Sequence, residues 1–151
     1  MTATSDMHSR HLVCPRCHAV NRVPGERPAL EARCGGCHQR LFSGQATATV
    51  EARFNTHLAR DDIPVLVDMW APWCGPCRQM APQFEAAAAR LEPDIRLLKL
   101  NLDDAHATAS RFNVRGIPAL LLFHKGRLVG QMAGLQTADA IVAWVRSSLK
   151  T

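Results

Sequence analysis

The chain has 151 residues, of which 47% are hydrophobic and 21% are charged. This length suits one domain of ordinary size with a small appendage and is too short for two full domains. The composition excludes a disordered, collagen-like or coiled-coil protein. The basic excess, 18 Lys and Arg against 13 Asp and Glu, is spread along the chain, which argues against a nucleic-acid partner.

The first twelve residues are polar and contain no apolar stretch long enough for a secretory signal or a membrane span. We therefore expect a cytoplasmic monomer that is not associated with a membrane. Because the cytoplasm keeps thiols reduced, the six cysteines indicate metal ligands or redox catalysis rather than structural disulfides.

The cysteines form three pairs, each with two residues between its members. Two pairs, Cys14 with Cys17 and Cys34 with Cys37, lie in a segment, residues 10–44, with too few large apolar side chains to build a core. Such a segment needs disulfides or a bound metal to fold. Sixteen residues separate the pairs, a spacing typical of zinc sites. Four thiolates can enclose one structural Zn²⁺ tetrahedrally, and folding of the segment would then depend on the metal.

Three other interpretations of this cysteine cluster stay open. His18 follows Cys17 and His38 follows Cys37, so both pairs also have the form used for covalent haem attachment, which the lack of an export signal argues against. Either histidine could replace one cysteine as a zinc ligand. The pairs could also form two reversible disulfides without metal. In a zinc site, oxidation of the thiolates would release the metal and could regulate a redox activity.

After residue 44 the sequence alternates between strand-like and helix-like patterns. We divide the chain into a flexible tail at 1–11, a zinc-binding ribbon at 12–44 and an α/β domain at 45–151. Strands are expected at 46–49, 64–70, 95–101, 119–123 and 128–132, and helices at 50–59, at 74 or 75 to 91, at 105–112, and from an N-cap at Thr137. This order, βαβαβα followed by a hairpin and a helix, predicts a mixed central sheet with helices on both faces.

Apolar residues at helical spacing predict which helix faces are buried. The expected inward residues are Val50, Phe54 and Leu58 in the first helix, Phe84, Ala88 and Leu91 in the second, and Ile141, Trp144, Val145 and Leu149 in the last. Pro82 is expected to bend the second helix.

The third pair, Cys74 and Cys77, lies where a buried strand ends and a helix begins. Unpaired backbone N–H groups and the helix dipole at this point favour a thiolate at Cys74, which we expect to be exposed, with Cys77 shielded one turn later. Gly75 permits the tight turn, and Pro76 fits the first helical turn. Cys74 is therefore predicted to attack a substrate disulfide, after which Cys77 attacks Cys74 and releases the reduced product.

The sequence around this pair resembles the thioredoxin family. The matching segments are Val67–Cys77, with Met69 where phenylalanine is commoner, Pro82, Lys99–Asn101, Arg115–Pro118, Gly126 and Gly134. The match runs from about residue 45 to 150 and implies a thioredoxin fold. The cysteine-rich segment ahead of it, with Asn21–Pro24 and Leu41–Phe42, is similar to that of the zinc-binding bacterial thioredoxins of the thioredoxin 2 type.

Asp68 is the only acid in its apolar strand, so burial should raise its pKa. The resemblance implies that this carboxyl group assists proton transfer to or from Cys77; the alternative is a plain ion pair. Lys99 could pair with Asp68 across neighbouring strands or face solvent.

Only the resemblance supports a cis bond before Pro118, because most such bonds are trans. It also implies a shallow apolar substrate surface around Cys74, although Trp73 could instead be a core residue. The expected members of this surface are Trp73, Gly75, Pro76, Ile117, Pro118 and Gly134.

The resemblance further implies a reductase of protein disulfides, because relatives that oxidise or isomerise disulfides commonly have histidine where this chain has Pro76. Its expected partners are disulfide-containing proteins and a flavin-containing, NADPH-dependent thioredoxin reductase, and it needs no organic cofactor. In the alternative interpretation, the ribbon is a docking or nucleic-acid-binding module that carries a redox domain. The ribbon has few aromatic residues, which argues against nucleic-acid binding.

Overall fold

The apolar run before the Cys74–Cys77 pair forms the central strand of a five-stranded sheet. In the computed structural model, which describes residues 9–150, the strand order is β3-β5-β4-β6-β7. β3 and β4 each run parallel to β5, whereas β6 is antiparallel to β4 and to β7. The predicted mixed sheet is therefore confirmed. The strands are β3 (Thr47–Thr49), β4 (Val65–Trp70), β5 (Arg96–Asn101), β6 (Ala119–His124) and β7 (Arg127–Ala133).

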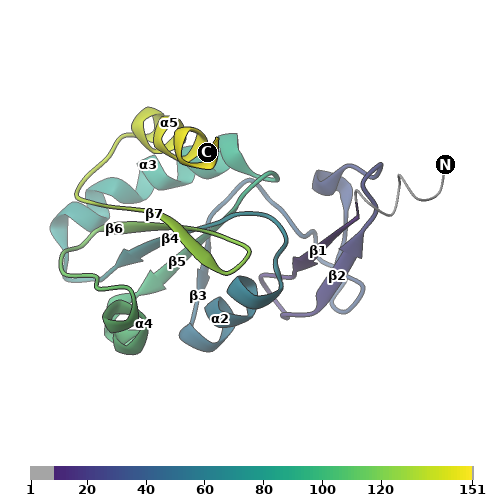
Figure 1. Cartoon of the computed structure of the whole chain (residues 1–151), viewed down its shortest axis with the longest axis horizontal. Coiled ribbons are helices and arrows are strands. Elements are labelled where there is room, and N and C mark those ends of the chain that lie inside the picture. The colour runs from purple at the N-terminus through teal and green to yellow at the C-terminus, as the bar shows by residue number, and fades with distance from the viewer. Residues whose placement is uncertain (1–8, 151) are drawn as a thin grey trace.

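Four helices cover the two faces of this sheet (Figure 1). They are α2 (Glu51–Arg60), α3 (Gly75–Leu91), α4 (His106–Arg111) and α5 (Ala138–Leu149). Because strand side chains alternate between faces, Leu66 of β4 packs in one apolar cluster with α3 and α5, and Val67 packs in another with α2 and α4. The predicted layers and the order of elements are confirmed.

Most of the helix residues that the apolar spacing predicts to face inward are buried. Phe54 and Leu58 are buried, as are the three residues predicted for α3. Val50 is the exception: it is the N-cap of α2, its backbone is extended, and 51% of its surface is exposed. A cap residue lies outside the helical turn, so it does not share the buried face of the turns that follow.

The N-terminal segment, residues 9–44, forms a hairpin that the sequence did not predict. Its strands β1 (Arg10–Val13) and β2 (Val20–Val23) pair antiparallel, and a short 3₁₀ turn, η1 (Ala29–Glu31), follows. β1 starts two residues ahead of the predicted ribbon boundary, and most of the predicted tail, residues 1–8, lies outside the described residues.

Contrary to expectation, this segment does build a small apolar core. Leu12, Leu41 and Phe42 are buried there together with two of the cysteines. Ile63, which precedes β4, belongs to the same cluster. The segment thus completes its core with a side chain of the α/β domain.

Between residues 9 and 150, no helix is both long enough and apolar enough to cross a membrane.

Candidate active site and metal centre

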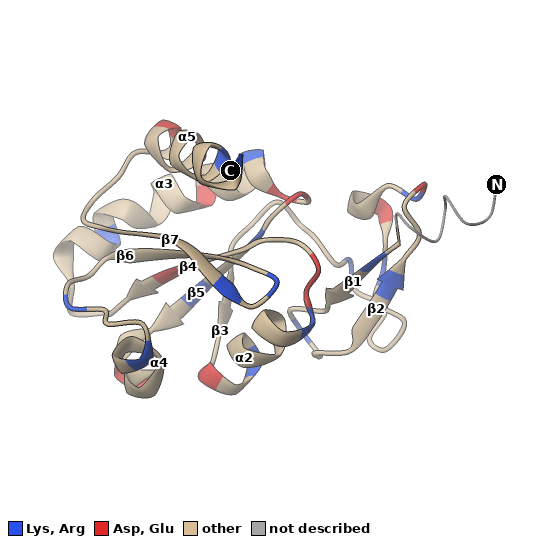
Figure 2. Ribbon diagram, in the orientation of Figure 1, with Lys and Arg blue, Asp and Glu red and all other residues tan. Residues whose placement is uncertain are grey.

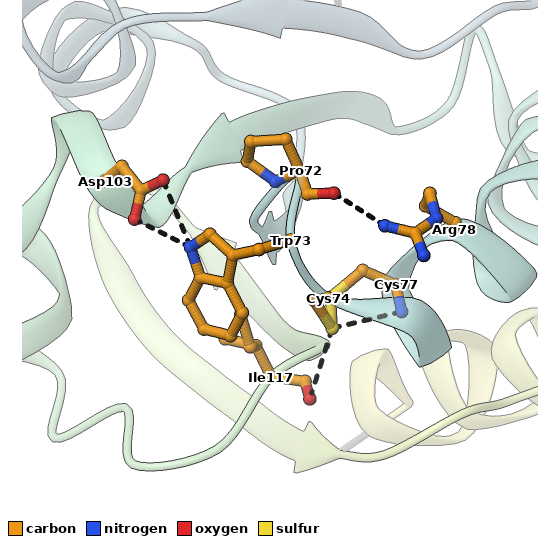
Figure 3. Close-up of a disulfide and its surroundings, with 7 residues drawn as sticks. All are labelled: Pro72, Trp73, Cys74, Cys77, Arg78, Asp103 and Ile117. Atoms are coloured by element: carbon orange, nitrogen blue, oxygen red, sulfur yellow. Dashed lines mark hydrogen bonds between the residues drawn. A yellow bond between two sulfur atoms is a disulfide. The ribbon is translucent and has the colours of Figure 1, made fainter.

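Cys74 and Cys77 form a disulfide at the start of α3 (Figure 3). Cys74 is the N-cap of the helix, and its sulfur accepts a hydrogen bond of 3.2 Å from the Cys77 amide. Pro76 occupies the first turn, where its missing N–H leaves no helical bond unmade. The Cys74 sulfur therefore lies where unpaired amides and the helix dipole stabilise negative charge.

The two cysteines are buried to nearly the same extent, with 5% of Cys74 and 3% of Cys77 exposed. The expectation that Cys74 is clearly exposed is therefore wrong for this disulfide form. The disulfide packs against Ala71 and the side chain of Ile117, and the Cys74 sulfur lies 3.9 Å from the Ile117 carbonyl oxygen (Figure 3). The Ile117 loop therefore lies directly beside the Cys74 sulfur.

The bond between Ile117 and Pro118 is cis, as the resemblance implied. The Pro118 carbonyl accepts a 2.8 Å hydrogen bond from the Gly134 amide. Gly134 has a φ of +100°, a conformation that favours glycine. The loop before β6 and the end of β7 are thus joined next to the disulfide.

Trp73 is 64% exposed, so the alternative of a core tryptophan is wrong. Its indole Nε1 donates to both carboxylate oxygens of Asp103, at 3.1 and 3.2 Å (Figure 3). The sequence analysis missed Asp103, which lies in the 3₁₀ turn η2 (Leu102–Asp104) directly after β5. Because β4 and β5 are parallel, the residues that follow them meet at one edge of the sheet. That rule could have paired Asp103 with Trp73.

A second missed contact holds the turn that leads to the disulfide. The Arg78 guanidinium, in the first turn of α3, donates a 2.7 Å hydrogen bond to the carbonyl of Pro72 (Figure 3). The loop Pro72–Cys74 is thereby tied to the helix that follows it.

Asp68 is buried, with 1% of its surface exposed, and its Oδ1 atom has no hydrogen-bond partner. Burial raises the pKa of Asp68 to about 7, although the Lys99 charge acts to lower it. Asp68 shares its strand face with Leu66, so it points to the side of the sheet that α3 covers. Cys77 belongs to α3, and the carboxyl group is therefore on the same side of the sheet as the disulfide.

Lys99 lies opposite Asp68 in the register of β4 and β5. Its ammonium group is 5.2 Å from the ring centroid of Trp70, close enough for a cation–π contact. Lys99 is half-buried and acts on Asp68 through its charge.

The sulfurs of Cys14, Cys17, Cys34 and Cys37 all lie within 4.8 Å of one another. The Cys14–Cys37 and Cys17–Cys34 sulfurs are 3.6 and 3.5 Å apart. A tetrahedral Zn²⁺ with bonds of about 2.3 Å places its sulfurs about 3.8 Å apart. These four side chains therefore fit a single tetrahedral metal ion.

Hydrogen bonds to the sulfurs favour the thiolate form that a metal requires. The amide of Arg16 donates to the Cys14 sulfur at 3.4 Å, and that of Gly36 donates to the Cys34 sulfur at 3.3 Å. The side-chain amide of Asn21, which the sequence analysis did not assign to the metal site, donates to Cys34 at 3.5 Å. The site is therefore supported by a second layer of polar contacts.

The alternative ligands are less well placed. Within residues 9–150, the group of close metal-ligating atoms contains the four cysteines and neither His18 nor His38. Both histidines have a positive φ, at +67° and +65°, and take the turn position after their cysteine pair. The four thiols are free, and their separations exceed the length of a disulfide bond, about 2.05 Å.

Comparisons with known proteins agree with this geometry. The family model described as Thioredoxin matches residues 45–147, and the one described as Thioredoxin 2, N-terminal, matches residues 13–39. Thioredoxin C-3 of Corynebacterium nephridii is 37% identical over 139 residues, 92% of this chain and 95% of that protein. The thioredoxin of Rickettsia conorii is 33% identical over 104 residues, 69% of this chain and 99% of that protein.

Among solved structures, a mutant thioredoxin from Halobacterium salinarum is 31% identical, with a TM-score of 0.63, and the match covers 73% of this chain and 96% of that one. Fold, disulfide position and sequence therefore lead to the same conclusion. The chain belongs to the thioredoxin family and is a protein disulfide oxidoreductase.

Proposed function

We propose that the chain reduces disulfides of other proteins, with Cys74 as the nucleophile and Cys77 as the resolving cysteine. The observation that carries this proposal is the position of the Cys74 sulfur at the N-terminus of α3, where the Cys77 amide donates to it. Helix N-termini lower the pKa of a thiol, and the thiolate is the attacking species.

The reaction then has two exchange steps. The Cys74 thiolate attacks one sulfur of the substrate disulfide, whose S–S bond breaks, and the other substrate sulfur leaves as a thiolate that takes up a proton. Cys77 loses its proton and attacks Cys74, which restores the Cys74–Cys77 disulfide and releases the second substrate thiol. Two electrons pass from the cysteine pair to the substrate.

In this mechanism Asp68 exchanges the proton of Cys77. A carboxyl group with a pKa of about 7 gives and takes a proton readily at neutral pH. Lys99 keeps that pKa from rising further. Asp68 is thus a positioning and proton-transfer residue behind the disulfide, out of reach of a protein substrate.

The substrate is expected to lie on the surface beside Cys74. Trp73 is exposed, and its indole N–H donates to Asp103. Ile117 packs against the disulfide, and the Gly134 amide donates to the carbonyl of the adjacent Pro118. Gly75 has open space above it, as a close approach of another chain requires. Pro76 completes the turn.

We also propose that Cys14, Cys17, Cys34 and Cys37 bind one Zn²⁺. Four cysteine ligands leave no open position, so the metal would be structural. Its role would be to hold the two cysteine turns of the N-terminal segment together. Metal analysis of the reduced, purified chain should give one zinc per molecule, and replacing Cys34 with serine should reduce that value to near zero. A full zinc content in Cys34→Ser would contradict this ligand set.

We propose a thioredoxin reductase as the electron donor. The domain boundaries at residues 12 and 45 and the cytoplasmic location stay predictions. Figure 2 shows Lys and Arg on most helices and strands, in the N-terminal segment as well as in the α/β domain.

Insulin reduction with dithiothreitol as electron donor tests the assigned cysteine roles. Cys74→Ser should show no turnover above the uncatalysed rate, because the nucleophile is gone. Cys77→Ser should accumulate a mixed disulfide with substrate that is visible by non-reducing electrophoresis, because the resolving step is lost. The double variant supplies the baseline, and full activity in either single variant would refute the assignment.

A further inference from the structure

The N-terminal segment is held by buried charged residues of the α/β domain, and these contacts converge beside the first metal-ligating cysteine. At the start of the segment, the Asp61 carboxylate, which follows α2, accepts a 2.7 Å hydrogen bond from the Val13 amide. The other oxygen of Asp61 is hydrogen-bonded to His57 of α2. Asp61 is 3% exposed, so its hydrogen bonds to Val13 and His57 are buried.

Asp62 makes a similar contact nearer the surface. Its carboxylate accepts from the His11 amide at 2.7 Å, and its own amide donates to the His11 carbonyl at 2.9 Å. Figure 2 shows this acidic segment between α2 and β4 lying next to β1. Strand β1 is therefore attached to the α/β domain along its length, and not only through the polypeptide chain.

The second set of contacts comes from Arg96, the first residue of β5, and from Glu92, which caps the end of α3. The Arg96 guanidinium donates to the Val13 carbonyl at 3.4 Å and stacks over the Phe42 ring at 4.0 Å. Glu92 lies 3.7 Å from Arg96 and accepts a 3.2 Å hydrogen bond from the Gly44 amide, where the chain leaves the N-terminal segment. Arg96 is 1% exposed and Glu92 is 6% exposed.

Both polar groups of Val13 are thus bound by the α/β domain, the N–H by Asp61 and the carbonyl by Arg96. The next residue is Cys14, which is fully buried and whose sulfur is 3.6 Å from that of Cys37. The position of Cys14 is therefore set by two charged side chains that are not part of its own segment. Buried charges of this kind are stable only while all their partners stay in place.

We propose that Asp61 and Arg96 are positioning residues for the metal site. Metal binding by the N-terminal segment and the stability of the α/β domain are therefore coupled. If the segment releases its metal and unfolds, Asp61, Glu92 and Arg96 lose their hydrogen bonds to that segment and keep only their partners within the α/β domain. Conversely, loosening of this junction releases Cys14 from its position. This inference rests on the proposed zinc site.

Zinc transfer from the full-length reduced chain to the chelator 4-(2-pyridylazo)resorcinol measures the first direction of this coupling. Asp61→Ala should release zinc about tenfold faster than the unaltered chain, because a buried, charged hydrogen bond to Val13 is lost. Asp61→Asn keeps an acceptor for the Val13 amide and should lie between the two. Asp62→Ala should have a smaller effect, since its contact is exposed, and Asp94→Ala, an exposed acid away from the junction, should have none.

Where Asp61→Ala does not fold, the double variant Arg96→Met/Glu92→Gln replaces it, because that pair of changes removes one charge of each sign and leaves no buried charge unpaired. It should also release zinc faster than the unaltered chain. Unchanged release from folded Asp61→Ala or from the double variant would overturn the positioning role.

The second direction needs no variant. All three tryptophans, Trp70, Trp73 and Trp144, belong to the α/β domain, so their fluorescence reports the unfolding of that domain alone. Removal of zinc under reducing conditions should lower the midpoint of this transition by about 5 °C or more. An unchanged midpoint would show that the two parts are independent. A chain that binds no zinc would instead refute the proposed metal site, so the two failures are distinguishable.

Discussion

Asp68 shows how a single buried carboxyl group links stability to chemistry. In the folded chain burial raises its pKa from 3.8 to about 7. Between these two values the unfolded chain has an ionised carboxylate and the folded chain a protonated one. The folded state therefore binds more protons, and the contribution of Asp68 to stability falls as the pH rises from about 4 to 7 and stays at its lowest value above that.

Replacing Asp68 with asparagine should remove this penalty. At pH 8 the oxidised Asp68→Asn variant should be more stable than the unaltered chain by up to about 4 kcal/mol, at 1.36 kcal/mol per pKa unit, with little gain near pH 4. Urea unfolding at the two pH values measures the difference, and the exposed Asp94→Asn change is the control. The variant should also turn over insulin more slowly, since Cys77 loses its proton acceptor. An equal gain in stability at both pH values would contradict the assigned pKa.

At the scale of single elements, helix α5 shows how a local signal sets a boundary. Thr137 is its N-cap, and the Thr137 hydroxyl oxygen accepts a 3.1 Å hydrogen bond from the Ala140 amide. Ile141 and Val145 of this helix pack into the core beside α3. The cap therefore stabilises an element that covers the same face of the sheet as the disulfide helix.

Thr137→Ala should lower the free energy of unfolding by about 1 kcal/mol, because the Ala140 amide loses its partner. Thr137→Ser keeps a hydroxyl at this position and should restore most of the loss. Chemical denaturation followed by circular dichroism provides the comparison. A loss of equal size in both variants would mean that the threonine methyl group, and not the cap, carries the effect.

At the scale of the whole molecule, the N-terminal segment and the α/β domain share one apolar cluster as well as the charged junction. Ile63 is 4% exposed and packs in the cluster that contains Leu12 and Phe42. Ile63→Ala should destabilise the chain by about 2–4 kcal/mol, because it leaves a cavity between the two parts. Val50→Ala, at an apolar position that is 51% exposed, is the matched control and should cost less than about 0.5 kcal/mol. Thermal unfolding of both variants tests this, and similar losses would show that Ile63 contributes no more than a surface residue.

The sequence by itself determined the order of elements and the redox pair. Apolar spacing sets which residues a helix or strand must bury, and local patterns predicted β4 and α3 to within a residue and the start of α5 at its Thr137 cap. The isolated acid at Asp68 and the Cys74–Cys77 turn could be interpreted from neighbours along the chain alone. The resemblance to thioredoxins supplied the cis bond at Pro118, which spacing could not predict.

The tertiary structure decided the contacts between residues that are distant in sequence. Asp103 meets Trp73 only because β4 and β5 are parallel neighbours, and the near-equal burial of the two active-site cysteines depends on the loop at Ile117. Asp61 and Arg96 meet at Val13, 48 and 83 residues away along the chain. Local patterns record which side chains are buried, but the pairing of buried charges depends on how whole elements pack, and that is fixed only when the chain is folded.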